Sequence, residues 1–326
     1  MFSLRAIHYL IKYFNSIDKK LSNYLVRKQP WDEESLTRMF CDLLDQDYQE
    51  EDNIDYTLTQ LYSDLSKAND PIALDVSIET HHYTKSYEHN ITKSDIGLIL
   101  EYIDQFNSKN SFKSYLLFQA KRLFPVQYEY TIKSKFNSFE KHQHNEITKL
   151  NEWAGGNFVS YLLYCPRPEK LIKTTRERLV YARNEAFENN IFDFAFGQEL
   201  RDDLLHDSRT IAAGIFVSEV NKMPCEFYEI HKSIFQGFSP FSWFIVQLFQ
   251  GINARSFLKQ NEYIYNYHHN ENDKIKCMRE IVEGKLSQMS KVLLNDEDIY
   301  FNENILPKHT LRIKIINGVD RNNFLK

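Results

Sequence analysis

Glycine and proline are scarce in this 326-residue chain, at 9 and 8 residues, and no stretch of it is low in complexity. This composition argues against a collagen-like or intrinsically disordered protein. Hydrophobic residues make up 42% of the chain and charged residues 26%. That is enough apolar material for a sizeable core, in one large domain or two ordinary ones.

Cysteine is also rare. The four cysteines, at positions 41, 165, 225 and 277, are far apart and form no C-x-x-C pair. This pattern excludes a disulfide framework and a zinc knuckle, and it favours a reducing compartment. We therefore expect the protein to be cytoplasmic.

Long hydrophobic runs are missing as well. The longest, residues 241–249 (FSWFIVQLF), falls short of the roughly 18 residues that span a membrane, and it predicts a buried helix. The apolar N-terminal segment is interrupted by Arg5, His8 and Lys12 and has no small-residue cleavage site, so it is not read as a signal peptide. Its helical spacing predicts an amphipathic helix that packs on the body or on a partner, the alternative being a membrane-surface helix. No membrane partner is expected.

Neither sign of charge dominates, since 40 Lys and Arg stand against 45 Asp and Glu for a net charge of −5. No overall basic field marks a nucleic-acid binder, although an enzyme needs only a local basic groove. The sequence contains no G-x-x-x-x-G-K-[ST], G-x-G-x-x-G or G-x-S-x-G motif, so any ATP-driven step is expected in another chain. The histidines lack zinc-site spacing and are expected to be solvated; they lie at positions 81, 82, 89, 142 and 144.

The periodicity predicts an α/β (α+β) fold, with a central mixed sheet flanked by helices and a mainly helical C-terminal region. The predicted helices are 3–29 (one or two), one starting at Asp32, 133–153, 171–187, 196–205 and 239–257. The predicted strands are 95–103, 115–124, 158–165 and 310–316. We divide the chain into an N-terminal helical segment (1–30), a central α/β domain (31–190) and a mainly helical regulatory or partner-binding domain (191–326).

The first two of these strands form a predicted hairpin, apolar on both faces and therefore central in the sheet. Side chains alternate along a strand, so Gln119 and Lys121 project from one face. A hairpin centred on Ser108 pairs Asp95 with Lys121, and centring it on Lys109 slides the pairing by two residues without changing the face. A carboxylate, an amide and an ammonium are thus expected together. The alternative is an ordinary cross-strand ion pair with a polar neighbour.

Asp95 followed by Gln119-Ala120-Lys121 resembles the D…(D/E/Q)-x-K motif of the PD-(D/E)XK nuclease superfamily, which has the restriction-endonuclease-like fold. The segments SDIGLILEY and YLLFQAKRL are similar to its Gln variant, found among bacterial restriction and phage-defence nucleases. A helix acid ahead of the sheet, Glu33 or Glu34, and Gln143 on the helix after the lysine strand complete the resemblance over residues 31–165, about two-fifths of the chain. Two departures are Ser94 in place of the usual proline and neutral Gln119 in place of an acid.

The resemblance implies a role for each of these residues. Asp95, Gln119 and Glu33 would hold Mg²⁺ or Mn²⁺, and Glu33 shares its helix face with apolar residues whereas Glu34 does not. Lys121 would orient or deprotonate the attacking water, and Gln143 would contact the phosphate or the lysine. The alternatives are a strand-end salt bridge for Asp95, a satisfied core amide for Gln119, and surface positions for Lys121 and Gln143.

The implied activity is a metal-dependent endonuclease that hydrolyses DNA phosphodiester bonds in bacterial anti-phage defence. This activity would be held in check until a protein partner or activator, such as a sensor or ATPase chain, releases it. A homodimer would suit cleavage of both strands. Arg122 is a candidate phosphate contact, and so is a basic strip that follows Cys165, unless that strip is simply a solvated helix face. The strip consists of Arg167, Lys170, Lys173, Arg176, Arg178 and Arg183. The alternatives are an inactive nuclease-fold scaffold or binding module, and an interaction protein that acts through its helical half; DNA and RNA remain open as substrates.

Overall fold

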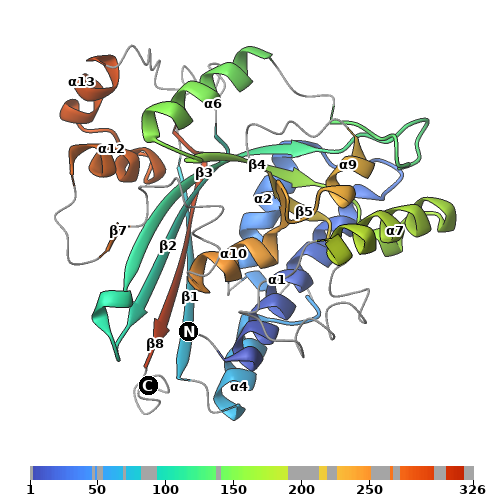
Figure 1. The fold of residues 1–326 in the computed structure, drawn as a ribbon, viewed down its shortest axis with the longest axis horizontal. Helices are drawn as coiled ribbons and strands as arrows, with labels where there is room; N and C mark the ends of the chain where they lie inside the picture. The colour runs from blue at the N-terminus through green and yellow to red at the C-terminus, as the bar shows by residue number, and fades with distance from the viewer. Residues whose placement is uncertain are drawn as a thin grey trace.

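The computed structural model describes residues 3–45, 48–49, 54–68, 71–81, 94–136, 141–189, 213–218, 226–250, 265–266, 272–296 and 306–318. These form a mixed β-sheet flanked by helices, which confirms the predicted α/β class (Figure 1). In Figure 1, α1 (Leu4–Leu25), α2 (Glu33–Leu44), α4 (Leu58–Lys67) and α10 (Phe241–Gln250) lie on one side of the long strands. The helices α6 (Lys141–Ala154), α12 (Asp273–Val282) and α13 (Gln288–Asp296) lie on the other side.

The sheet has the order β1-β8-β2-β3-β4-β5-β6, and the short strand β7 (Tyr265–Asn266) pairs with β3. Its remaining strands are β1 (Ile72–Thr80), β2 (Ile96–Asp104), β3 (Phe112–Arg122), β4 (Val159–Tyr164), β5 (Ile215–Ser218), β6 (Phe238–Pro240) and β8 (His309–Asn317). β2 and β3 are antiparallel, whereas β2–β8 and β3–β4 are parallel. The predicted central position of the hairpin is therefore confirmed.

Capping side chains fix where the first two helices begin. The Ser3 side chain accepts a hydrogen bond from the amide of Ala6, so α1 begins at Leu4. Asp32 caps α2 as the sequence predicts, accepting from the Ser35 amide at 2.7 Å. This cap places Glu33 at the first position of α2.

The register of the hairpin differs from both predicted pairings. Ile96 pairs with Phe118, and continuing this register by one residue sets Asp95 beside Gln119, not Lys121. The reason lies in the turn, where the Asp104 carboxylate accepts hydrogen bonds from the amides of Phe106 and Asn107 and draws the centre of the loop toward position 107. The shift is two residues, so the predicted face is kept.

The expected domain division at position 190 does not separate two sheets among the described residues. β8 lies between β1 and β2, and β5 and β6 continue the sheet beyond β4. The side chains of Leu311, Ile313 and Ile315 are buried in the same core as Ile7 and Leu10 of α1. Hydrophobic residues from the N-terminal helix to β8 thus share one core, and the C-terminal part contributes strands as well as helices.

One predicted helix begins later than expected, and another lies outside the described residues. The helix expected at 133–153 begins at Lys141 among the described residues, because Lys135 instead bridges to Phe124 and Glu226 in extended backbone. The helix expected at 196–205 lies outside the described residues. The helix α7 (Lys173–Asn189) corresponds to the predicted 171–187, and α9 (Phe227–Lys232) packs beside it.

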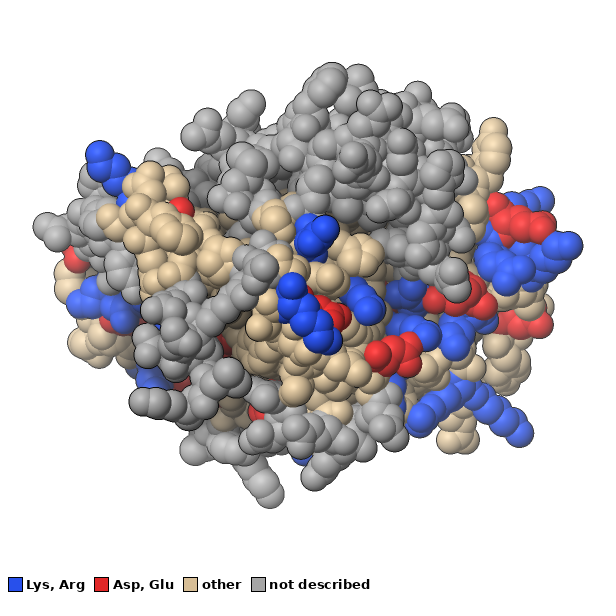
Figure 2. All heavy atoms as spheres, turned by 90° about the horizontal axis from the view of Figure 1, so that it is seen from below, with Lys and Arg blue, Asp and Glu red and all other residues tan. Residues whose placement is uncertain are grey.

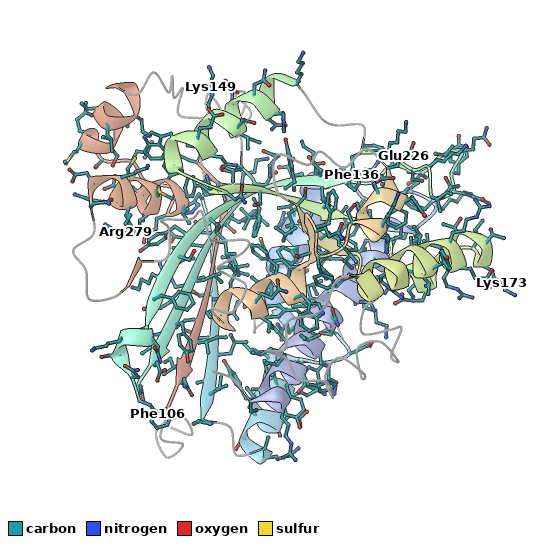
Figure 3. The ribbon with its side chains drawn as sticks, viewed as in Figure 1. Phe106, Phe136, Lys149, Lys173, Glu226 and Arg279 are labelled. Atoms are coloured by element: carbon teal, nitrogen blue, oxygen red, sulfur yellow. The ribbon has the colours of Figure 1, made fainter. Side chains whose placement is uncertain are left out.

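No helix in the described part of the chain has the length and apolar character needed to cross a membrane. Lys and Arg side chains mix with Asp and Glu at the end of the molecule that carries α7 (Figure 2). Figure 3 places Lys173 at the outer end of α7 and Phe106 at the opposite end of the molecule, in the turn between β2 and β3.

Candidate active site

Asp95 and Gln119 form the centre of the candidate site. Asp95 directly precedes β2, and its amide donates to the carbonyl of Phe118 on β3 at 2.8 Å. Its Oδ2 accepts hydrogen bonds from Nε2 of Gln119 at 2.6 Å and from the amide of Ala120 at 2.8 Å. The hairpin therefore brings the carboxylate and the amide into direct contact.

Lys121 and Glu33 form an ion pair next to this centre, in which the lysine is buried and the glutamate is half-buried. Lys121 is only 4% exposed, so it is not a surface lysine, and its Nζ lies 3.6 Å from Oε1 of Glu33. Oε2 of Glu33 accepts a hydrogen bond from the amide of Arg122 at 3.0 Å. Glu34 instead points outward, with a 77% exposed side chain that pairs with Lys308. Glu33, not Glu34, therefore lies in the cluster.

Gln143 reaches the cluster from α6. Its Nε2 donates to Oε1 of Gln119 at 3.1 Å, so a hydrogen-bonded chain runs from Gln143 through Gln119 to Asp95. Gln143 is thus a partner of Gln119, and it is not the fully exposed helix residue considered as its alternative. All five residues singled out in the sequence lie in one connected group.

The pKa of Asp95 is set by its burial and by the charged and hydrogen-bonding groups around it. Burial, with a smaller contribution from the nearby carboxylate of Glu33, raises the net pKa of Asp95 to about 7. The hydrogen bond from Ala120 and the charges of Lys121 and Lys308 oppose this rise and lower the pKa. Two carboxylates thus share a site in which positive charge favours ionisation.

Lys308 is the residue that the sequence reasoning missed. It directly precedes β8, and its Nζ lies 3.0 Å from Oε1 of Glu34 while its charge acts on Asp95. The basic residue before the predicted strand 310–316 was a visible signal. The position of β8 beside β2 could not be predicted, because the local sequence does not determine which strand an isolated strand pairs with.

The donor set limits how a metal could bind. The described residues contain no group of three or more His, Cys, Asp or Glu side chains placed to hold a metal ion. Asp95 and Glu33 supply two carboxylates, and Gln119 would supply an amide oxygen after rotation of its amide. Within the described residues both side-chain hydrogen bonds of Asp95 reach Oδ2, which leaves Oδ1 for a cation. This set fits Mg²⁺, which is commonly held by one or two carboxylates together with substrate phosphate.

Two of the histidines expected to be solvated make hydrogen bonds instead. His81 contacts the Thr310 hydroxyl at 2.7 Å through Nε2, and His144 contacts the Tyr161 hydroxyl at 3.1 Å through Nδ1. His82 and His89 lie outside the described residues, as does the side chain of His142. Within the described residues neither His81 nor His144 belongs to a metal-binding group.

The candidate phosphate contacts are arranged differently from expectation. Lys173 and Arg176 are exposed on α7, with Lys173 paired to Glu177 at 3.8 Å. The guanidinium of Arg122 donates to the carbonyls of Pro30 and Trp31, so it holds the segment before α2. Lys173 and Arg176 are therefore exposed to solvent, whereas Arg122 is engaged within the protein.

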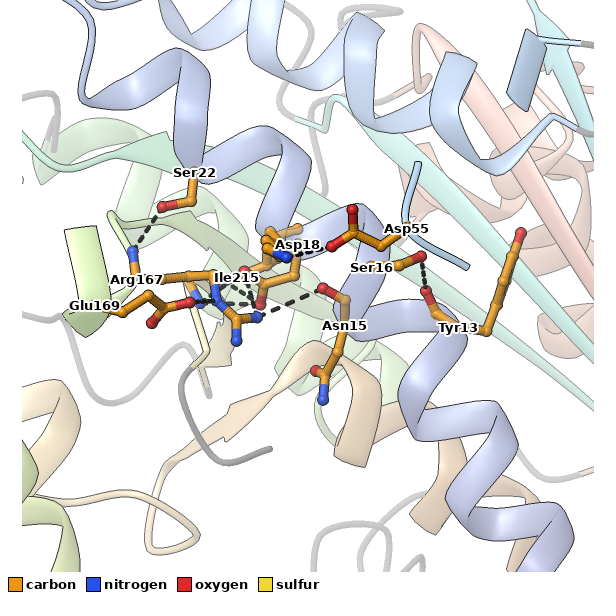
Figure 4. Close-up of polar contacts among 11 residues, drawn as sticks. Tyr13, Asn15, Ser16, Asp18, Ser22, Asp55, Arg167, Glu169 and Ile215 are labelled. Atoms are coloured by element: carbon orange, nitrogen blue, oxygen red, sulfur yellow. Dashed lines mark hydrogen bonds and ion pairs between the residues drawn. The ribbon is translucent and has the colours of Figure 1, made fainter. Parts of the chain in front are cut away.

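Two members of that predicted strip are buried in the interior. Arg183 is fully buried, and Arg167 pairs with Glu169 at 2.5 Å and with Asp18 at 3.7 Å (Figure 4). Asp18 also accepts hydrogen bonds from the amides of Gly214 and Ile215. Arg167 thus ties η2 (Pro168–Lys170) to α1, and neither arginine lies where a phosphate backbone can reach it.

Comparisons with protein-family models, curated proteins and solved structures give no match for this chain. A function for it must therefore be argued from the arrangement of its own residues. The arrangement that points most clearly to a chemical function is the cluster of Asp95, Gln119, Lys121, Glu33 and Gln143.

Proposed function

We propose that this chain is a metal-dependent endonuclease of the PD-(D/E)XK type that hydrolyses phosphodiester bonds of DNA. One observation supports this above the others: the five residues that carry the sequence resemblance meet in space. They come from α2, the start of β2, β3 and α6, and each contacts another member of the group. A chance match to a short motif would not be expected to assemble four separate elements.

The residues divide the chemistry among them. Asp95 and Glu33 would hold Mg²⁺ or Mn²⁺, with the Gln119 oxygen completing the protein donors. When bound, the ion supplies positive charge against the phosphate and lowers the pKa of a water molecule. Lys121 would orient that water and offset the charge that develops on the phosphate. Gln143 positions Gln119 through the hydrogen bond between their amides.

One observation favours a second candidate, an inactive nuclease-fold scaffold. Gln119 carries no charge where the motif usually has an acid, and its Nε2 already satisfies Asp95. Lys121 is already paired with Glu33. A group whose members satisfy one another in this way is also what a structural polar cluster requires.

The cellular part of the proposal rests on the resemblance. In this proposal the protein is a cytoplasmic effector of bacterial anti-phage defence that acts on DNA once a protein partner or activator releases its activity. The buried free thiols of Cys41, Cys165 and Cys277 agree with a reducing compartment. A homodimer would allow two cuts on opposite strands.

Plasmid cleavage by the purified protein tests the activity. The assay compares Mg²⁺, Mn²⁺ and chelator for the wild type and for the variants Asp95→Ala and Lys121→Ala, each checked for folding by circular dichroism. Lys113→Ala is the matched control, because Lys113 forms an ion pair with Glu101 at 3.2 Å toward the other end of the same two strands. Metal-dependent cutting by wild type and control, lost in both site variants, supports the nuclease. Cutting that survives both site substitutions overturns the site.

A further inference from the structure

A groove of about 700 Å³ lies between the end of α1, the turn after β3 and the segment that follows η2. Its lining includes Arg27, Lys28, Pro30, Tyr128, Tyr130 and Lys170. The Tyr130 hydroxyl donates to the carbonyl of Leu25 at 3.2 Å, which fastens the turn to the last turn of α1. The groove is therefore held open by a specific contact between its two walls.

The turn displays an aromatic ring to solvent. Val126 and Glu129 exchange two backbone hydrogen bonds, at 2.8 and 3.0 Å, and the residues between them have positive φ, 51° for Gln127 and 70° for Tyr128. Such angles strain residues other than glycine, yet the Tyr128 side chain is 97% exposed and gains no burial in return. Positive φ at both central residues is the geometry of a two-residue hairpin turn, and this turn leaves the Tyr128 ring where a ligand can reach it.

The charges around the ring suit an anion. Arg27, Lys28 and Lys170 are exposed on the groove lining, where Glu129 is the one acid. The guanidinium of Arg27 lies 4.2 Å from the centre of the Tyr24 ring, a cation–π contact that positions it. Basic side chains beside an exposed aromatic ring are what single-stranded nucleic acid requires, since phosphates take the cations and an unstacked base takes the ring.

Two residues of the groove lining are linked to the candidate active site through the chain or through hydrogen bonds. Pro30, on its wall, accepts a hydrogen bond through its carbonyl from the Arg122 guanidinium at 3.4 Å, and the amide of Arg122 donates to Glu33. Pro125, on the other wall, follows Lys121 by four residues, at most about 14 Å of chain. The groove thus lies near the candidate active site.

We propose that this groove binds a single strand of nucleic acid, with a base stacked on Tyr128 and phosphates on Arg27, Lys28 and Lys170. The direction of the strand toward Lys121 rests on the proposed nuclease function, whereas binding in the groove does not. A duplex keeps its bases stacked on each other and presents none to Tyr128. A protein surface that binds a bilayer usually protrudes and is apolar. This groove suits a bilayer poorly, because its lining is concave and carries the acidic Glu129.

Binding is measured by fluorescence anisotropy in chelator, with the full-length protein and labelled 12-nucleotide single-stranded DNA, the same RNA, and a 12-base-pair DNA duplex. Tyr128→Gly removes the ring and at the same time relaxes the positive φ, so it cannot weaken binding by straining the turn. We expect it to weaken single-strand binding about tenfold, while Tyr128→Phe stays within about twofold of wild type. Phe106→Ala is the matched control, because Phe106 is a 73% exposed aromatic residue at the opposite end of the molecule.

Lys28→Gln combined with Lys170→Gln should lower the affinity for both single strands and reduce the salt dependence of binding by about 1 to 2 in slope. Comparing the affinities for single-stranded DNA and RNA shows which backbone the groove accepts. Single-strand affinity that is unchanged in Tyr128→Gly overturns the proposal. So does binding to phosphatidylserine vesicles that this variant abolishes while the wild type binds neither single strand.

These outcomes are separate from those of the nuclease proposal. If Tyr128→Gly loses the binding that the wild type shows, and the wild type cuts no substrate, the groove is supported and the nuclease gains no support. Cleavage that requires Asp95 but is unaffected by Tyr128→Gly, with unchanged binding, contradicts the groove and supports the nuclease.

Discussion

The carboxylate of Glu33 accepts a hydrogen bond from the amide of Arg122 at 3.0 Å and lies 3.6 Å from the ammonium of Lys121. One side chain thus ties the first turn of α2 to the end of β3. The amide contact fixes the distance between helix and strand, and the ion pair satisfies a buried lysine.

Glu33→Gln separates these two tasks. Glutamine still accepts from the Arg122 amide but leaves Lys121 without its counter-charge, so we expect a loss of about 1–2 kcal/mol in the free energy of unfolding. Cleavage should fall at least about tenfold if Glu33 holds the metal. Glu34→Gln is the control, because the 77% exposed Glu34 side chain should change stability by less than about 0.5 kcal/mol. Equal effects from the two substitutions in urea unfolding and plasmid cleavage would contradict this assignment.

Gln119→Glu tests whether the cluster is a metal site. A third carboxylate beside Asp95 and Glu33 adds like charge, so the variant should melt at a lower temperature than wild type in chelator. Mg²⁺ should reverse this order, so that the variant melts at a higher temperature than the wild type, because the variant should bind the ion more tightly. A ligand at 100 times its Kd stabilises the folded state by about 2.7 kcal/mol. Thermal melts of both proteins in chelator and in Mg²⁺ measure the two differences in melting temperature. A variant insensitive to Mg²⁺ would instead favour the scaffold.

Lys308→Ala removes the cation that β8 brings toward Asp95. Its charge lowers the pKa of Asp95, so its loss should favour the protonated carboxyl and weaken metal-dependent cleavage at pH 7. We expect a fall of about two- to fivefold that is recovered in part at pH 8, where Asp95 ionises again. Cleavage rates from pH 6 to pH 8.5, compared with those of Lys113→Ala, check this. A fall that is the same at every pH would show that Lys308 acts by other means.

His231 gives the protein an acid-sensitive point. It is fully buried between the rings of Phe216 and Phe227, and burial lowers its pKa to about 3, with a smaller contribution from Arg183. Between pH 6.5 and pH 3 the unfolded chain therefore binds one proton more than the folded chain, and stability falls as the pH falls. By pH 5 this amounts to about 2 kcal/mol.

His231→Leu should remove that dependence. Urea unfolding at pH 7 and pH 5 is expected to show a smaller loss of stability for the variant than for wild type, by about 2 kcal/mol. The comparison between the two pH values cancels any packing change that leucine introduces. A stability difference between variant and wild type that is the same at both pH values would contradict the assignment.

Gly214→Ala tests the buried contact between α1 and β5. An added Cβ would stand 2.6 Å from the carbonyl oxygen of Cys165 and 2.8 Å from Oδ1 of Asp18, both of them held in the interior. The clash should also disturb the hydrogen bond from the Gly214 amide to Asp18, and we expect a loss of about 2–3 kcal/mol. Urea unfolding measures it; an unchanged midpoint would show that the strand shifts without cost.

The local pattern predicted the site better than the sheet around it. Alternation along β3 was enough to place Gln119 and Lys121 on one face, and hairpin pairing brought Asp95 to them. The register was wrong by two residues because it depends on the hydrogen bonds of Asp104 inside the turn, which spacing does not reveal. Because the pleat repeats every two residues, this error left the predicted face intact.

The positions of β8 and Arg183 could not be read from the sequence for a different reason. β8 has a recognisable strand pattern, but its partners β1 and β2 are chosen by which edges remain open in the assembled sheet. Arg183 lies among charged residues on α7 and resembles a surface residue until the packing of α9 against that helix is known. Both depend on contacts between elements that are distant in sequence.

The place of β8 also sets an order of events in time. It lies between β1 and β2, yet it is made more than 200 residues after β2 ends. At about 5–20 residues per second, synthesis leaves β2 without this neighbour for roughly 10 to 40 seconds. During that interval Lys308 has not joined Asp95, and the hydrophobic edge of β2 is open to other chains. A newly made molecule would therefore be most prone to aggregation, and without its complete site, until its last strand enters the sheet.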